Sequence, residues 1–253
     1  MDARTAFITG ASSGIGKALA LRLAQEGVEI GLAARRTEQL QNVARTIHES
    51  GGRAQIFELD VRQPKAVIET MQRADDAMKG IDLVIANAGL ANNRRAQKFR
   101  WAECEDMLAV NVTGAAATLT ALLDRMVSRD RGHLVGVSSL AGMRALPGMA
   151  AYTASKAFLS RFLEGLRIDL SNTNIHISDV RPGFVSSEMT AHYKTTGQPM
   201  PFLVSAEAAA NIITESIISK EHVIAFPWQM KRLMQTATLL PEAMWRHSVR
   251  RIM

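Results

Sequence analysis

Seven short apolar runs alternate along this chain with segments in which apolar residues recur at helical spacing. One such segment carries Leu40, Val43, Ala44 and Ile47 on a single helical face. The runs are apolar throughout rather than at every second residue, which is typical of parallel strands buried on both faces. This alternation indicates an α/β fold, in which a doubly wound, parallel seven-stranded sheet lies between two helical layers. The predicted strands are residues 5–9, 29–33, 54–59, 83–86, 133–137, 176–180 and 222–226.

The alternation continues without a linker, repeat or low-complexity stretch, so we expect residues 1–253 to form a single catalytic domain. Apolar residues make up 47% of the chain and charged residues 21%, which is typical of globular proteins. Residues 184–204 interrupt the rhythm with Gly197, Pro199 and Pro201. This composition predicts a loop, which we interpret as a substrate loop.

Charge and cysteine content limit the partners and the compartment. The chain carries 30 Lys and Arg against 24 Asp and Glu, and no block of like charges indicates nucleic-acid binding. The single Cys104 excludes an intrachain disulfide, which favours a reducing compartment. The apolar run from Thr5 leaves no room for a signal peptide, and no uninterrupted apolar stretch approaches ~18 residues. We therefore expect a cytoplasmic protein. The six histidines form no ligand-spaced cluster, so no metal is expected.

A glycine-rich turn follows the first predicted strand and opens a helix predicted over residues 17–25. In that setting Gly10 permits a tight turn, Gly14 lets the backbone approach a pyrophosphate, and Gly16 lets the helix pack close to the strand. The spacing differs from the commoner Gly-x-Gly-x-x-Gly, and three glycines at a turn are also compatible with a purely structural role. The turn reads Thr9-Gly10-Ala11-Ser12-Ser13-Gly14-Ile15-Gly16.

With this turn, the sequence resembles the short-chain dehydrogenase/reductase family, whose single-domain members have a Rossmann-like fold. The resemblance covers roughly residues 3–187 and implies an enzyme that transfers hydride between a nicotinamide dinucleotide and a ketone, aldehyde or alcohol. The residues that carry it further along the chain are, in order, Asp60-Val61, Asn87-Ala88-Gly89, Asn111, Ser139, Tyr152-x-x-x-Lys156 and Pro182-Gly183.

The resemblance also implies where the cofactor binds. Asp60 and Val61 would border the adenine, the segment after the fourth strand would support the sheet beside the cofactor, and Ser187 would lie near the carboxamide. Turn formation is the simpler interpretation of Asp60 taken alone. The implied cofactor-binding set is Gly10, Ser12, Ser13, Gly14, Ile15, Gly16, Arg35, Arg36, Asp60, Val61, Asn87, Ala88, Gly89, Tyr152, Lys156, Pro182, Gly183, Val185 and Ser187.

The end of the second predicted strand bears on which dinucleotide binds. A carboxylate there would accept hydrogen bonds from the ribose 2′-OH, whereas a guanidinium would bind a 2′-phosphate. This chain has Arg35 and Arg36 and no acid at that place, which favours NADP(H), with NAD(H) as the second choice. Ser13 departs from this pattern, because many NADP-preferring relatives have Lys or Arg there. Alternatively, both arginines are a solvated start of a loop.

Two residues four apart indicate the chemistry. Tyr152 and Lys156 lie on one face of a helix predicted over residues 150–166, and the ammonium group is expected to lower the phenol pKa of ~10 by about 1 to 3 units. By resemblance, Ser139 holds the substrate oxygen beside Tyr152, the acid/base of the reaction. By analogy, Asn111 anchors a water near Lys156 in a proton relay. A helix-bending or capping asparagine is the other interpretation.

An enzyme is the favoured interpretation because Asn111, Ser139, Tyr152 and Lys156 are all present. The alternative is a catalytically silent cofactor-sensing or scaffold protein, since relatives of that kind typically lose the tyrosine or the lysine. Residues 184–204 hold few polar side chains, so we expect an uncharged and mainly apolar carbonyl substrate. The apolar lid would comprise Met189, Met200, Phe202 and Leu203, beside the polar Ser186, Ser187, Glu188, His192, Tyr193 and Lys194.

Residues 228–253 form an amphipathic C-terminal extension. Helical spacing of apolar residues runs to Pro241, after which a second stripe begins beside three arginines. We expect this extension to pack on protein, over the substrate cleft or in a homo-oligomer (a dimer or tetramer). Peripheral contact with an anionic membrane is the alternative, because the extension contains five Lys and Arg and only one acidic residue, Glu242. The first stripe comprises Met230, Leu233, Met234 and Ala237, and the second Trp245, Val249 and Ile252.

Overall fold

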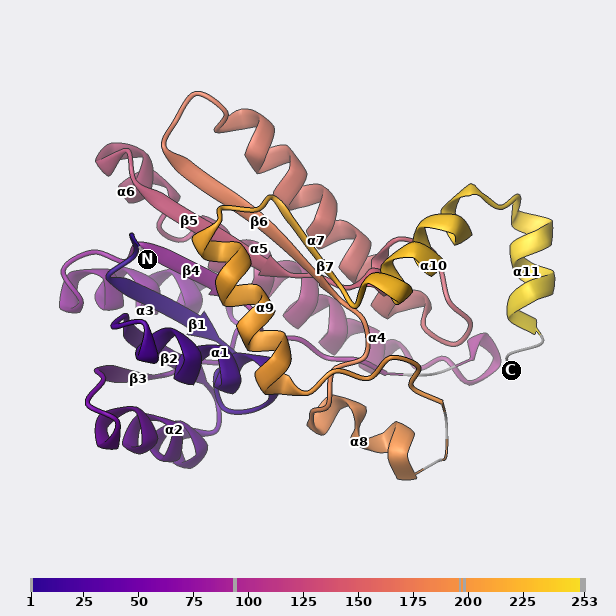
Figure 1. The fold of residues 1–253 in the computed structure, drawn as a ribbon, viewed down its shortest axis with the longest axis horizontal. Helices are drawn as coiled ribbons and strands as arrows, with labels where there is room; N and C mark the ends of the chain where they lie inside the picture. Colours follow the sequence, from indigo (N-terminus) through magenta and orange to yellow (C-terminus); the bar gives the residue numbers. More distant parts are fainter. Residues whose placement is uncertain (1, 93–94, 196, 198, 251–253) are drawn as a thin grey trace.

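A computed structural model describes residues 2–92, 95–195, 197 and 199–250. Its centre is a seven-stranded sheet in which every pairing is parallel, with helices on both faces (Figure 1). The predicted fold is thereby confirmed, and all seven predicted strands are present, with ends that differ by at most two residues. The strands are β1 (Thr5–Thr9), β2 (Glu29–Ala34), β3 (Ala54–Glu58), β4 (Leu83–Ala86), β5 (Gly132–Val137), β6 (Ile175–Pro182) and β7 (Val223–Phe226).

The strand order is β3-β2-β1-β4-β5-β6-β7, so the chain winds outward from β1 in both directions. Between β1 and β4 the winding reverses, and the loops that leave these two strands diverge to opposite faces. In sheets of this kind the carboxyl ends beside the reversal form a crevice where ligands bind. The topology therefore places the turn after β1 and the loops after β4 and β5 at one edge.

Two apolar clusters attach the helices to the sheet. The helices α1, α2 and α9 share a cluster with Ile8 and Val135, whereas α3, α5 and α7 share the opposite one with Phe7 and Leu134. Neighbouring residues of one strand thus point to opposite faces, which accounts for strands that are apolar throughout. The helices are α1 (Gly14–Gln25), α2 (Thr37–Glu49), α3 (Pro64–Ala77), α4 (Trp101–Leu108), α5 (Ala115–Thr120), α6 (Leu123–Arg129), α7 (Ala150–Asp169), α8 (Glu188–Thr195), α9 (Ala206–Ile218), α10 (Trp228–Leu239) and α11 (Glu242–Arg250).

The stretch Trp101–Arg129 is the one described helix that is long and apolar enough to cross a membrane by length and composition. It runs through α4, the π-helical turn η2 (Ala109–Gly114), α5 and α6. Over half of its apolar window is buried in the protein, and Leu119 and Leu122 belong to the cluster on the sheet. This packing is that of a core helix.

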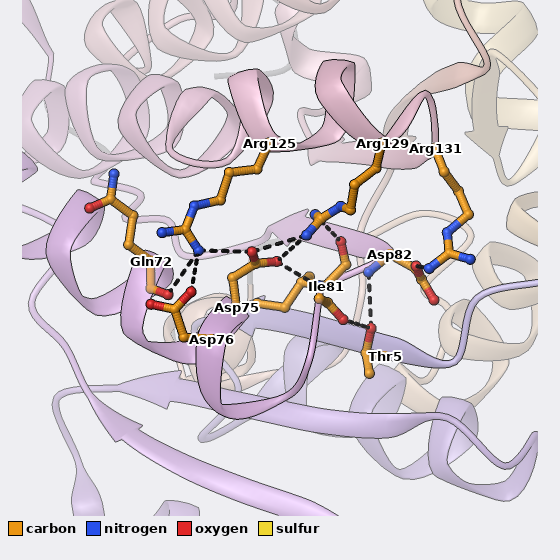
Figure 2. Close-up of polar contacts among 10 residues, drawn as sticks. Thr5, Gln72, Asp75, Asp76, Ile81, Asp82, Arg125, Arg129 and Arg131 are labelled. Carbon is orange, nitrogen blue, oxygen red and sulfur yellow. Dashed lines mark hydrogen bonds and ion pairs between the residues drawn. The ribbon is translucent and has the colours of Figure 1, made fainter.

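A buried carboxylate joins α3 to α6 at the amino-terminal edge of the sheet. Figure 2 shows Asp75 between Arg125 and Arg129, whose Nη1 atoms lie 2.9 and 3.0 Å from Oδ2. Its Oδ1 accepts the backbone N–H of Ile81 at 2.7 Å. Although burial raises the pKa of Asp75, the hydrogen bonds from Arg129, Ile81 and Arg125 outweigh it and hold that pKa below its usual value. The network anchors the turn that leads into β4.

The predicted loop over residues 184–204 contains a helix, α8, which the proline and glycine content concealed. Val185 and Val204, near its two ends, form an isolated parallel bridge, and Ser186 N donates to Val204 O at 2.9 Å. These bonds join the two ends of the segment to each other. Of the polar side chains predicted beside the lid, those of His192 and Lys194 lie outside the described part of the structure.

The C-terminal extension forms two helices that project beyond the sheet (Figure 1). On α10, Met230 and Met234 pack against Leu140, in η3 (Leu140–Gly142), the 3-10 turn that follows β5. Leu233, which the sequence predicted in the same stripe, is instead 56% exposed, because it lies on the flank of the helix. Ile252 and Arg251 lie outside the described residues. The first predicted stripe is thus buried against this chain itself at Met230, Met234 and Ala237.

Candidate active site

A cleft of about 530 Å³ opens at the carboxyl edge of the sheet, where the strand order reverses. It brings together residues from the turn after β1 and from the ends of β2 to β6, which are far apart in sequence. Of the predicted site residues, only Gly16 and Asn111 do not line it. Those that do are Gly10, Ser12, Ser13, Gly14, Ile15, Arg35, Arg36, Asp60, Val61, Asn87, Ala88, Gly89, Ser139, Tyr152, Lys156, Pro182, Gly183, Val185 and Ser187.

The glycine-rich turn has the conformation that its sequence predicted. Gly10 has a φ of 68°, in the left-handed region that favours glycine. A Cβ on Gly16 would lie 2.3 Å from Gly10 O and 2.4 Å from Asn87 Nδ2, so only glycine permits this approach of α1 to the turn. No side chain caps the N-terminus of α1. The first residues of α1, Gly14 and Ile15, line the cleft, so their uncapped N–H groups are available to bind an anion there.

Asn87 fastens the turn to the strand beside it. Its Nδ2 donates to Thr9 O at 3.0 Å and to Gly10 O at 3.2 Å. Thr9 Oγ1 in turn accepts the backbone N–H groups of Asn87 and Ala88, at 3.2 and 3.3 Å. These bonds hold the turn in place, in agreement with the supporting part that the resemblance implied for this segment.

Two arginines occupy the far end of the cleft, and they have different surroundings. Arg36 Nη2 donates to Ser12 Oγ at 3.1 Å and to Ser13 Oγ at 2.9 Å, so its guanidinium lies over the glycine-rich turn. Arg35 is exposed. A hydrogen bond from Arg62 is the main reason that the pKa of Asp60 is lowered, and the charge of Arg35 adds to it. The sequence named both arginines as candidates, and Arg36 is the one that contacts the turn itself.

At the other end of the cleft, Ser139, Tyr152 and Lys156 converge. Ser139 follows β5 and is buried, while Tyr152 and Lys156 lie one turn apart on α7. The Lys156 Nζ atom is 5.9 Å from the centre of the Tyr152 ring and donates to Val137 O at 2.8 Å. The Ser139 hydroxyl interacts with the Tyr152 side chain and accepts the Ala141 N–H at 3.1 Å. A hydroxyl, a phenol and an ammonium group thus meet in one place.

The expectation that Lys156 lowers the pKa of Tyr152 is wrong for the protein chain alone. Burial raises the pKa of the Tyr152 phenol, and its hydrogen bond with Ser139 opposes the rise without cancelling it. Burial also lowers the pKa of Lys156 to about 8, against the opposing charge of Asp179. Desolvation disfavours the charged form of both groups, so the neutral phenol is a proton donor near neutral pH.

Asn111 lies behind the cleft, where a Cβ on Gly89 would be 3.5 Å from its Oδ1 and 3.4 Å from Lys156 Nζ. It lies in η2 and is 1% exposed. Its Nδ2 donates to Leu90 O at 2.9 Å and Ser155 Oγ at 3.0 Å, and its Oδ1 accepts the Leu90 N–H at 2.8 Å. The side chain therefore links the loop after β4 to α7, and it is engaged with protein on every polar atom. The helix-bending interpretation agrees with the π-helical turn at this residue.

Several cleft residues were missed by sequence reasoning. Met149 is an apolar residue directly before α7, where the pattern carries no signal for it, whereas Phe184 begins the predicted substrate loop. Ser138, beside the predicted Ser139, also lines the cleft and donates through Oγ to the buried Asp179. Asp179 itself had a detectable signal, because it is a lone carboxylate within an apolar strand. Of the four predicted lid residues, Met189 lines the cleft, whereas Met200, Phe202 and Leu203 do not; Tyr193, one of the polar residues of the same segment, also lines it.

Comparison with known proteins agrees with this geometry. The family model for short chain dehydrogenases matches residues 4–198. An uncharacterized oxidoreductase of Myxococcus xanthus is 45% identical over 252 residues, covering all of this chain and 98% of the relative.

Two solved structures have a similar fold. A short-chain dehydrogenase from Sphingobium yanoikuyae in complex with NADPH is 26% identical, with a TM-score of 0.80 over 94% of this chain and 97% of that one. A short-chain dehydrogenase/reductase from Burkholderia phymatum in complex with NAD is 23% identical, with a TM-score of 0.85 over 92% of each chain, and shows likeness of fold. The match of sequence, fold and cleft leads to one conclusion: this chain belongs to the short-chain dehydrogenase family of oxidoreductases.

Proposed function

We propose that this protein is an NADP(H)-dependent oxidoreductase that interconverts an apolar ketone or aldehyde and the corresponding alcohol, with Tyr152 as the acid/base. The observation that carries the proposal is the convergence of Ser139, Tyr152 and Lys156 at one end of a cleft whose other end holds the glycine-rich turn.

The residues present fit a dinucleotide. The uncapped N-terminus of α1 would receive the pyrophosphate, and Asp60 would border the adenine. A Cβ on Gly89 would lie 3.4 Å from Lys156 Nζ. A side chain at position 89 would therefore crowd the ammonium group that would bind the nicotinamide ribose. When bound, the nicotinamide supplies or accepts the hydride.

The chain's own residues handle the proton. Ser139 donates a hydrogen bond to the substrate oxygen and so holds it beside the phenol. In reduction, the Tyr152 O–H gives its proton to that oxygen as negative charge develops on it, and in oxidation the same group takes the proton back. The pKa of Lys156 is lowered to about 8, so its ammonium group gives up a proton more readily than an ordinary lysine. Lys156 therefore replaces the proton that Tyr152 loses.

Two arginines support the preference for NADP(H). Arg35 and Arg36 line the cleft beyond the glycine-rich turn, and no carboxylate ends β2. A guanidinium forms paired, charge-assisted hydrogen bonds with a phosphate. Structures similar in fold hold NADPH in one case and NAD in another, so the family by itself leaves both cofactors open.

The walls of the substrate end support an apolar substrate. Met149, Phe184 and Met189 line it, and the Phe184 and Tyr193 rings pack edge to face with centres 5.7 Å apart. Thioether and ring surfaces favour hydrocarbon over charge.

Turnover with a panel of aliphatic, aromatic and alicyclic ketones and aldehydes tests the proposal. We expect NADPH oxidation with at least one apolar carbonyl, at a higher kcat/KM than with NADH. Binding of NADPH without turnover of any carbonyl or alcohol would instead support the cofactor-sensing alternative. Failure to bind either dinucleotide would contradict both interpretations.

A further inference from the structure

A carboxylate occupies the face of the sheet that α7 covers. On β6, Ile175 and Ile177 belong to the same apolar cluster as Leu159 of α7. Alternate residues of a strand point to the same face, so Asp179 follows these isoleucines on the α7 side. It is 0% exposed. At this position the pattern of the strand predicts an apolar side chain.

Two neighbours bind this carboxylate. Arg181 Nε lies 2.6 Å from Asp179 Oδ2, and Ser138 Oγ donates to Oδ1. A buried ion pair is weak evidence of a stabilising role, because apolar residues of similar volume often replace such pairs without loss of stability. The presence of Asp179 therefore suggests a role other than stability.

Ser138, the link to β5, stands between two residues of the active site. Before it, Val137 O accepts the Lys156 ammonium group, and after it, Ser139 interacts with Tyr152. Ser138 N donates to Val180 O at 2.7 Å, which continues the sheet past the end of β5. With its backbone N–H and its hydroxyl both bound to β6, Ser138 has little freedom to move.

We propose that Asp179 is a positioning residue of the active site, which holds residues 137–139 in place through Ser138 and presents its charge to Lys156. The inference rests on the proposed function, in which Lys156 and Tyr152 handle the proton. It adds a residue on β6 that contacts neither the substrate nor the reacting atoms.

The charges around Lys156 support the electrostatic part. Tyr152 faces it from the same helix, and Asp179, paired with Arg181, acts on it from β6. Tyr193 of α8 acts on Tyr152. Burial lowers the pKa of Lys156, and Asp179 is the charge that opposes the fall. Without that charge, the ammonium form is less stable and the pKa of Lys156 falls further.

The experiment reads the pKa of Lys156 directly, without turnover. Lysine labelled with ¹³C at Cε is followed by NMR across pH, and Lys156→Met identifies the signal, which titrates well below the ordinary lysine pKa of ~10.4. We expect Asp179→Asn, which keeps the volume and the hydrogen-bonding oxygen, to lower this pKa by about one unit. Ser138→Ala keeps the charge, so the pKa should stay in place while kcat falls about tenfold.

Asp75→Asn is the matched control, because Asp75 is also buried and bound by arginines but lies at the opposite edge of the sheet. It should change thermal stability and leave both kcat and the pKa of Lys156 unchanged. An unchanged Lys156 pKa in folded Asp179→Asn, or a kcat within about twofold of wild type in Ser138→Ala, overturns the inference. If Asp179→Asn does not fold, Ser138→Ala decides. Absence of turnover in the wild type contradicts the proposed function. The NMR titration would still test whether Asp179 raises the pKa of Lys156.

Discussion

Arg36 Nη1 lies 2.7 Å from Glu188 Oε2, so the end of β2 is joined to the start of α8 across the mouth of the cleft. The same guanidinium donates to Ser12 and Ser13 in the glycine-rich turn. Both partners of the ion pair are well exposed, so it contributes little to stability. The Glu188 carboxylate would instead compete with a 2′-phosphate for Arg36, and it would repel that phosphate.

Glu188→Gln should therefore strengthen NADPH binding by about two- to fivefold, the range of a weak exposed ion pair. Binding of NADH, which has no 2′-phosphate, should stay unchanged. Fluorescence titration of both cofactors measures the two Kd values. Glu207→Gln in α9 is the control, since it removes the same charge from an exposed residue, whereas Arg36 pairs with Glu188 in the described part of the structure. An equal change for NADPH and NADH would show that Glu188 does not act on the phosphate.

Arg35→Asp should shift the cofactor preference from NADP toward NAD. The new carboxylate accepts hydrogen bonds from the 2′-OH and repels a 2′-phosphate. The ratio of kcat/KM for the two cofactors measures the shift, and Arg36→Ala, assayed in parallel, shows how much the second arginine compensates. A ratio within about twofold of wild type would remove Arg35 from this role.

Tyr152→Phe should retain cofactor binding and lose turnover, because the ring stays and the proton donor is removed. General acid/base catalysis typically contributes ~10² to 10⁴ in rate, which sets the expected fall in kcat. Tyr193→Phe, the only other tyrosine, should act mainly on KM, since Tyr193 lines the substrate end of the same cleft. More than about a third of wild-type kcat in Tyr152→Phe would exclude the assigned role.

Stability should fall as the pH is lowered below the ordinary histidine pKa. Burial lowers the pKa of His133 to about 3, and its Nε2 lies 2.8 Å from Ser178 Oγ. The unfolded chain binds a proton near pH 6.5 and the folded chain does not, so this stability is complete above 6.5 and declines toward pH 3. At pH 5 the loss from His133 is roughly 2 kcal/mol.

His133→Gln removes the titrating group and keeps a hydrogen-bond donor. Denaturant unfolding at pH 7.5 and pH 5 should therefore show a smaller pH effect in this variant than in the wild type. His48→Gln, an exposed histidine, is the control and should leave the pH effect unchanged. Equal pH dependence in wild type and His133→Gln would show that the buried imidazole is not its source.

Deletion of residues 241–253 should lower kcat, because this segment supports the loop that leads from Ser139 to α7. Trp245 Nε1 donates to Ala145 O at 2.9 Å, and the deletion removes this bond. Steady-state kinetics, mass in solution and sedimentation with anionic liposomes are measured together. Unchanged kinetics and mass with lost liposome binding would instead support a peripheral membrane role, and a changed mass would indicate a role in a homo-oligomer.

Much of the fold follows from the sequence because its signals are local. A parallel strand buried on both faces must be apolar throughout, so β1, β4 and β5 are visible as runs. Gly10 and Gly16 identify the turn, since the left-handed φ and the 2.3 Å approach each exclude a side chain. Helical spacing likewise places Tyr152 and Lys156 on one face.

What the sequence could not determine depends on residues distant along the chain. The pKa of Tyr152 rises rather than falls because burial outweighs the opposing hydrogen bond with Ser139, and residue spacing does not report burial. Arg36 contacts both the glycine-rich turn and Glu188, which is 152 residues away, and neither contact is visible in the local sequence. Asp179 reaches Ser138 only because β5 and β6 pair in register. Local periodicity thus determined the elements, whereas burial and long-range pairing, which arise only when the elements pack, decided the electrostatics of the site.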